Sequence, residues 1–134
     1  QYARKTAAVY FSDIISSTQS DNLTLDIQNN IVWGNLLNEF VIDKKVAGTI
    51  LTATIKNNLL KSNELGYSNT GNILNSDPLF TNAFIGNFKL SKSSPAINKG
   101  ADLSSDAFIT PFLQKDLQNN SRIFPSELGC YENN

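Results

Sequence analysis

The residue types that most often carry catalysis are sparse in this chain. Histidine is absent, and Cys130 is the single cysteine among 134 residues. A histidine-based nucleophilic triad and a histidine-ligated metal site are therefore excluded within this sequence. A lone cysteine cannot form an intramolecular disulfide, and its simplest role is that of a small buried apolar residue.

Charged side chains could do polysaccharide chemistry only if the fold gathered them. Glycoside hydrolysis needs two carboxylates about 5–10 Å apart, and a calcium ion needs three or more clustered oxygen ligands. In the first half the carboxylates show no Asp-x-Asp cluster, and the cations are scattered between them. Solvated strand and turn charges are the simpler interpretation, so we predict no catalytic residue, no metal site and no cofactor. The side chains are Asp13, Asp21, Asp26, Glu39, Asp43 and Glu64, with Arg4, Lys5, Lys44, Lys45, Lys56 and Lys61.

Aromatic side chains are the better candidates for a binding role. Trp33, Tyr67, Tyr2 and Tyr10 combine apolar faces with polar tips, which suits them to stacking on sugars. We predict Trp33 and Tyr67 as ligand-binding residues. The alternative for Trp33 is a partly buried packing role beside Gly34.

Composition excludes two classes of partner. The formal net charge is −1, with no basic stripe of the kind that nucleic-acid binders carry. No apolar run approaches the roughly 20 residues of a membrane span. We therefore expect neither nucleic acid nor a membrane span.

The first half reads as short β-strands joined by asparagine-rich corners. Residues 23–27 alternate cleanly between apolar and polar, and residues 31–33, 39–43 and 49–55 are rich in β-prone types. The hexapeptide that begins at Ile27 recurs at Ile55, an offset of 28 positions. Such a repeat predicts stacked units. Asn29 over Asn57, or Asn30 over Asn58, would then form an asparagine ladder.

This pattern favours an all-β fold, a right-handed parallel β-helix whose coils end in an irregular cap. An antiparallel sandwich is the main competitor, because its short strands and turns would look alike. We expect coils over 1–75 and a closing coil and cap of the same domain over 76–134. Aromatic residues of the tail, which include Phe108, Phe112 and Phe124, would plug the open end.

Residues 71–100 carry the strongest local signals. Asn75-Ser76-Asp77-Pro78 predicts a turn, and residues 88–90 predict a half-buried strand. Ser94 and Pro95 look like a cap and the first position of one helical turn, which Gly100 would end in a left-handed conformation.

Motifs in this stretch and in the tail resemble the C-terminal end of secreted or surface pectate-lyase-like proteins, the right-handed parallel β-helix group common in Bacteroidetes. The order is Asp-Pro-Leu-Phe, Phe-Lys-Leu, Ser-Pro-Ala-Ile-Asn-x-Gly, then Asp and Arg six apart, then Gly-x-Tyr-Glu. Asn119 departs from the usual glycine, and Glu127-Leu128-Gly129-Cys130 replaces Asp-Ile-Gly-Ala. The matching residues are Asp77, Pro78, Phe80, Phe88, Leu90, Ser94, Pro95, Ala96, Ile97, Asn98, Gly100, Asp116, Arg122, Gly129, Tyr131 and Glu132.

The resemblance implies a setting and a choice of functions. It implies a secreted or cell-surface piece of a longer exported protein, with a scaffold, adhesin-like or carbohydrate-binding role. Polysaccharide lyases of this group use a basic proton acceptor and often Ca²⁺, so the alternative is a fragment of a lyase or glycoside hydrolase with catalytic coils upstream. The first coil would then pair with upstream coils or with a second copy. Arg122, with Asp116 or Glu132, is expected to be a structural ion pair.

Overall fold

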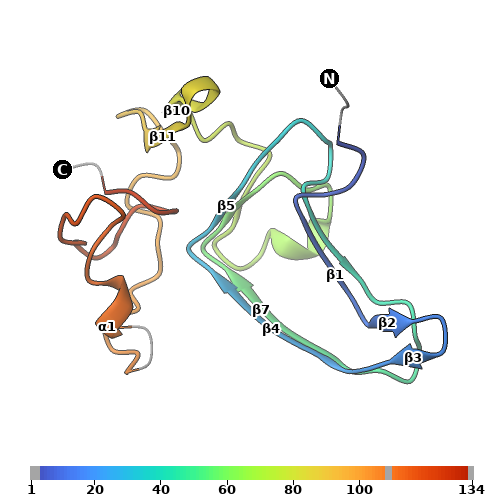
Figure 1. Ribbon diagram of the computed structural model, residues 1–134. Helices are drawn as coiled ribbons and strands as arrows, with labels where there is room; N and C mark the ends of the chain where they lie inside the picture. Colours follow the sequence, from blue (N-terminus) through green and yellow to red (C-terminus); the bar gives the residue numbers. More distant parts are fainter. Residues whose placement is uncertain (1–3, 108–109, 133–134) are drawn as a thin grey trace.

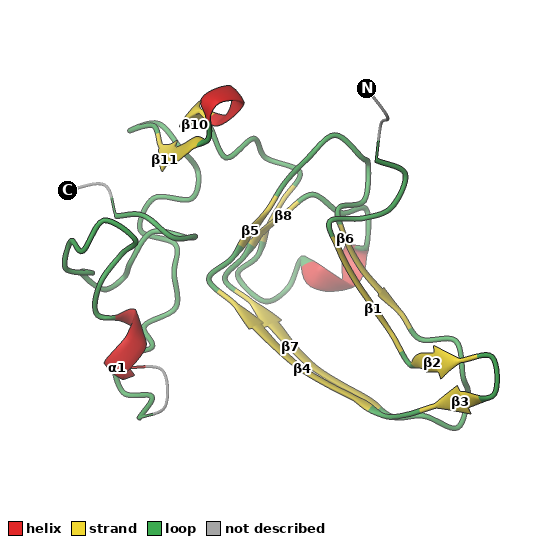
Figure 2. Cartoon of the chain, in the orientation of Figure 1, coloured by secondary structure: helices red, strands yellow, loops and turns green. Residues whose placement is uncertain are grey.

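The structure, a computed structural model, describes residues 4–107 and 110–132. Its strands are short, and its helices are single turns (Figure 2). The strands are β1 (Val9–Ser12), β2 (Ile14–Ser16), β3 (Gln19–Ser20), β4 (Leu23–Gln28), β5 (Ile31–Val32), β6 (Phe40–Asp43), β7 (Leu51–Lys56), β8 (Leu59–Leu60), β9 (Ile73–Leu74), β10 (Phe80–Asn82) and β11 (Asn87–Leu90). The helical turns are η1 (Leu65–Tyr67), η2 (Ala83–Ile85) and α1 (Thr110–Leu113).

Two consecutive passes of the chain stack in parallel at the predicted offset. β4 pairs with β7 from Leu23 opposite Leu51, and β5 pairs with β8 from Ile31 opposite Leu59. Both registers correspond to the 28-residue repeat. In this register Leu23, Thr24 and Ile27 each lie opposite the same residue type, which favours the pairing. β1 and β6 pair in parallel as well.

The predicted right-handed parallel β-helix is nevertheless wrong as a description of this fold. The described strands form four two-stranded sheets and one three-stranded sheet, and no solenoid is formed among them. The third strand of the largest sheet, β9, follows after only half the earlier spacing, with Ile73 opposite Leu59. The pass that precedes it is too short to add a strand to β6 or β7. The β2–β3 and β10–β11 pairs are antiparallel. A repeat of two copies therefore indicates that two neighbouring passes stack on each other, but it does not establish a β-helix.

An asparagine ladder marks the corner between the paired strands. Asn30 Nδ2 lies 3.2 Å from Asn58 Oδ1, and Asn58 Nδ2 lies 3.0 Å from Asn72 Oδ1. The predicted ladder at Asn30 and Asn58 is confirmed, with Asn72 as a further member. Asn29 and Asn57 adopt left-handed backbone angles, φ 60° and 50°, which asparagine tolerates better than most residues.

Asn29 and Asn57 hold the C-terminal part of the chain, which follows β11, against the sheets. Asn29 accepts a hydrogen bond from the Ala101 amide and donates one to the Ala101 carbonyl, at 2.7 and 3.0 Å. Asn57 donates to the Lys99 carbonyl at 3.0 Å. In Figure 1 the orange and red C-terminal segment lies beside the corner that precedes β5.

The main apolar core lies between the β5–β8–β9 sheet and this C-terminal part. Its buried members are Leu59, Leu90, Ala96 and Leu128. Half-buried residues pack around them, namely Ile31, Trp33, Ile73, Phe80 and Ile97. The tail therefore covers one face of the sheet, whereas the prediction placed its aromatics over an open end. Phe112 is largely exposed, and Phe108 lies outside the described residues.

Candidate binding site

A cavity of about 750 Å³ opens between the β5 corner and the C-terminal part. Ligand sites are typically concave, mostly apolar and of this size, with a few convergent polar groups. Its described lining residues are Gln28, Asn29, Asn30, Ile31, Trp33, Phe80, Phe88, Leu90, Leu103, Phe112, Leu113, Lys115, Asp116, Leu117, Arg122, Phe124, Ser126, Leu128, Gly129, Cys130 and Tyr131.

One wall of the cavity is aromatic. Phe80 on β10 and Phe88 on β11 make an edge-to-face pair with ring centroids 5.4 Å apart. The hairpin holds this pair because η2 ends at Gly86, whose φ of 78° closes the turn. Trp33 follows β5 and carries the Lys61 ammonium 5.0 Å from its ring centroid. Phe88 remains 47% exposed, so its ring is accessible to a ligand.

The structure separates the two predicted ligand-binding residues. Trp33 lines the cavity and also packs against the core cluster, so its packing role and its place in a cavity wall coexist. Tyr67 does not line this cavity, and its ring packs edge-to-face on Phe40 at 5.4 Å. The hydroxyl of Tyr10 is hydrogen-bonded to Asp43, and Tyr2 lies outside the described residues.

Hydrogen bonds connect the motif residues on either side of the β10–β11 hairpin. Asp77 accepts a hydrogen bond from the Leu79 amide at 2.8 Å, which forms the predicted turn. The hydroxyl of Ser94 donates to the buried Pro78's carbonyl at 2.7 Å and accepts from the Ala96 amide at 3.1 Å. Ser94 therefore caps the turn that contains Pro95.

Gly100 has a different role from the one predicted. Gly100 does not adopt a left-handed backbone conformation. Asn98 adopts it instead, with φ 53°. Gly100 is required because Ser126 is close: a Cβ at this position would lie 2.6 Å from Ser126 Oγ and 2.9 Å from its carbonyl oxygen. The Gly100 amide donates to that carbonyl at 2.9 Å. This close approach joins the segment around Gly100 to the tail around Ser126.

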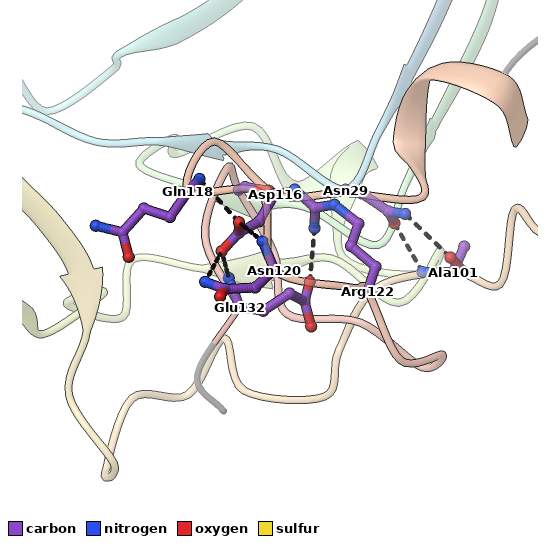
Figure 3. Close-up of polar contacts among 8 residues, drawn as sticks. Asn29, Ala101, Asp116, Gln118, Asn120, Arg122 and Glu132 are labelled. Carbon is purple, nitrogen blue, oxygen red and sulfur yellow. Dashed lines mark hydrogen bonds and ion pairs between the residues drawn. The ribbon is translucent and has the colours of Figure 1, made fainter.

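Asp116 organises the C-terminal loops (Figure 3). Its buried carboxylate accepts hydrogen bonds from the amides of Gln118, Asn120 and Glu132, and from the side chain of Asn120, at 2.8–3.1 Å. Burial opposes ionisation, yet these hydrogen bonds hold the pKa of Asp116 well below its usual range. Both oxygens are committed to the loops, so Asp116 is a structural anion.

Arg122 forms the expected ion pair with Glu132. Its Nη1 lies 2.7 Å from Glu132 Oε1, and its Nη2 donates to the Gly129 carbonyl at 3.1 Å. Burial, together with the hydrogen bond and charge of the neighbouring Glu127 carboxyl, raises the pKa of Glu132 to about 8. The charge of Arg122 opposes this rise, so Arg122 and the Glu127 carboxyl act on the pKa of Glu132 in opposite directions.

Two buried polar atoms in the described chain have no hydrogen-bond partner there, Gln28 Oε1 and Arg122 Nε. Both residues line the cavity. The sequence analysis did not single out Gln28, because nothing in a single glutamine marks a buried acceptor. The buried, unpartnered atoms of these residues can be recognised only in the tertiary structure, where β5 and the C-terminal part come together.

The remaining predicted chemistry gives no second site. Glu39 is fully buried, with its carboxylate held by Arg4 at 2.6 Å and by the Ala8 and Leu36 amides at 3.1 and 2.9 Å. Within residues 4–107 and 110–132, no group of three or more acidic or cysteine side chains is placed to hold a metal ion. No helix in the described chain is long and apolar enough to cross a membrane.

Comparison with protein-family models, with curated proteins and with solved structures found no match to this chain. The resemblance of the tail motifs to the pectate-lyase-like group thus stays a prediction from sequence.

Proposed function

We propose that this chain is a non-catalytic binding module that takes a carbohydrate into the cavity beside β5. The observation that carries the proposal is the aromatic wall, in which Phe88 is half exposed and Trp33 and Phe80 lie in the same cavity. Aromatic rings offer an apolar face to the C–H face of a sugar, while hydroxyls find polar groups at the rim. A volume of about 750 Å³ is ample for one or two sugar rings.

The enzymatic alternative has no specific observation in its favour. Asp116 is the carboxylate among the described residues of the cavity wall, and its oxygens are occupied by four hydrogen bonds. General acid or base catalysis needs a carboxylate that can reach a substrate proton.

Phe88 and Phe84 offer a matched test of the binding proposal. Both lie on the β10–β11 hairpin segment, but Phe84 is 98% exposed at its tip and does not line the cavity. The experiment is a glycan array followed by calorimetric titration with the best-bound sugar. We expect Phe88→Ala to weaken binding about tenfold, corresponding to about 1.4 kcal/mol, and Phe84→Ala to bind like the wild type. Equal binding by both variants would place the ligand elsewhere.

The cellular setting and a macromolecular partner belong to the same proposal. We place the module on a secreted or cell-surface protein, which the resemblance of the tail motifs supports and cell fractionation would test. β4 and β5 each lie at the edge of their sheet. An open edge is a pairing site, which supports association with an upstream segment of a longer chain or with a second copy.

A further inference from the structure

Lys61 lies against Trp33, which is the chain's single tryptophan and lines the cavity. β5 pairs in parallel with β8, with Val32 opposite Leu60, and Trp33 and Lys61 are the next residues of the two passes (Figure 2). The Lys61 ammonium lies over the indole, 5.0 Å from its ring centroid. Lys61 itself does not line the cavity, so the ammonium and the cavity meet different parts of the same ring.

The partly buried Lys61 is held both at its backbone and at the end of its side chain. Its amide donates to the Val32 carbonyl at 3.0 Å, and its carbonyl accepts from the Glu39 amide at 2.8 Å. At the other end, Nζ donates to the Gly34 carbonyl at 2.6 Å. The ammonium therefore has a fixed place beside Trp33, and its attraction to the face of the ring opposes rotation of the indole.

Gly34, which accepts this hydrogen bond, is itself closely confined. A Cβ added to Gly34 would lie 2.7 Å from Glu39 Cδ. The Glu39 carboxylate is fully buried and is held by Arg4 and by two backbone amides. The residue that follows Trp33 thus has little room to move, which gives the Lys61 ammonium a stable anchor.

We propose that Lys61 is a positioning residue for carbohydrate binding. Its ammonium holds the Trp33 indole in one orientation, and a sugar stacks on the part of the ring that Lys61 leaves to the cavity. A ring that is already held loses less conformational freedom when a ligand binds, and such preorganisation increases affinity. This inference rests on the proposed carbohydrate-binding function, and it names a residue outside the cavity on which affinity depends.

The test uses two substitutions of Lys61 and one control. Lys61→Arg keeps a cation that can lie over the ring, whereas Lys61→Met keeps an unbranched apolar stem and removes the charge. Lys56→Met is the matched control, because Lys56 is an exposed lysine on β7 and does not line the cavity. The probes are linear oligosaccharides of glucose, galactose, mannose and galacturonic acid, titrated by calorimetry.

We expect the wild type to bind at least one probe, and Lys61→Met to bind that probe about threefold to fivefold more weakly, the range of one cation–π contact. Lys61→Arg and Lys56→Met should keep wild-type affinity. The bound sugar should also protect Trp33 from quenching by acrylamide, a readout that belongs to this ring alone because the chain has one tryptophan.

A second readout needs no ligand. Time-resolved fluorescence anisotropy should show fast local rotation of the indole in Lys61→Met, and a restrained indole in the wild type and in Lys61→Arg. If Lys61 contributed only to stability, the melting temperature would fall while the ring of the folded protein stayed restrained.

Four results would overturn the inference. Wild-type affinity in Lys61→Met, with binding weakened in Phe88→Ala, would refute the role of Lys61 and leave the proposed function standing. Equal losses of affinity in Lys61→Arg and Lys61→Met would refute a role for the cation. A probe that binds in calorimetry and leaves the quenching of Trp33 unchanged would place the sugar away from this ring. Absence of binding to every probe by the folded wild type would refute the proposed function and this inference together.

Discussion

At the scale of single residues, the chain uses its buried carboxylates to hold loops. Asp116 accepts four hydrogen bonds, Glu39 accepts from two amides and Arg4, and Glu132 is held by Arg122. Sequence alone treated Asp116 and Arg122 as structural, and the contacts agree. It did not single out Glu39, whose burial depends on contacts up to 35 residues away in the sequence.

Asp116→Asn should destabilise the protein by about 2–3 kcal/mol at pH 7, because charge-assisted hydrogen bonds to a buried carboxylate are among the strong ones. The pKa of Asp116 is lower in the folded state than in the unfolded state. Its contribution to the free energy of unfolding is therefore fully present above the unfolded pKa near 3.9 and is lost as the pH falls through the folded pKa. Urea unfolding from pH 7 to pH 2 measures this. The variant should lose less stability over the acid range than the wild type, and parallel curves would contradict the prediction.

Glu132 should make the free energy of unfolding depend on pH in the opposite direction. Its folded pKa is raised to about 8 from the usual value of 4.5, so the folded state holds a proton that the unfolded state has released. The free energy of unfolding should therefore fall as the pH rises from about 5 to about 8. Glu127→Gln removes the neighbouring carboxylate and should flatten this fall, whereas Glu64→Gln, an exposed control, should not. Urea unfolding at each pH is the measurement, and identical slopes in all three proteins would refute it.

At the scale of elements, the asparagine ladder joins three successive corners. Asn58 is fully buried, and its side chain accepts from the Asn30 amide and donates to the Ile27 carbonyl, both at 2.9 Å. Each side chain thereby replaces hydrogen bonds that strand pairing cannot supply at a corner.

Asn58→Ala should cost about 3 kcal/mol of stability, because it leaves buried backbone groups without partners. Asn30→Ala, at the exposed end of the ladder, should cost about 1 kcal/mol or less. Chemical denaturation of the two variants gives the comparison. Equal costs would show that the ladder does not stabilise its interior more than its end.

Gly100 tests the closure of the tail. A Cβ there would come within 3.0 Å of both Ser126 Oγ and the Ser126 carbonyl oxygen. Gly100→Ala should destabilise by about 1–3 kcal/mol through overpacking, and Gly48→Ala is the control, because nothing lies within 4 Å of a Cβ at that position. Thermal unfolding of the two variants measures the difference, and a neutral Gly100→Ala would contradict the close approach.

At the scale of the whole molecule, the open edge of β4 should govern association. Leu23 bonds toward β7 through its amide, and amides alternate in direction along a parallel strand, so the Thr24 amide points to the open edge. We expect concentration-dependent self-association in sedimentation velocity. Thr24→Pro removes that edge donor and should abolish association, with folding checked by circular dichroism. A wild type that stays monomeric at high concentration would exclude pairing between copies.

The sequence by itself determined the features that repeat or act locally. Alternation over residues 23–27 located β4, the 28-residue repeat set its register against β7, and Asp77 with Pro78 located a turn. Such features depend on neighbours in the chain or on like residues stacking over like. Two copies of the repeat suggested a longer solenoid, because sequence did not reveal that the next pass adds a strand only to the β5–β8 sheet and none to the β1–β6 or β4–β7 sheet.

Only the tertiary structure decided where the C-terminal part packs and which residues share a cavity. It placed Trp33 and Phe88 in the lining of one cavity, and it packed Tyr67 on Phe40 instead. It also enclosed Gln28 and Arg122 with unpartnered polar atoms. These contacts join segments up to about 100 positions apart, and a single residue at each end carries no periodic signal of its distant partner. Their geometry is set by how apolar faces are buried together, which depends on the whole chain at once.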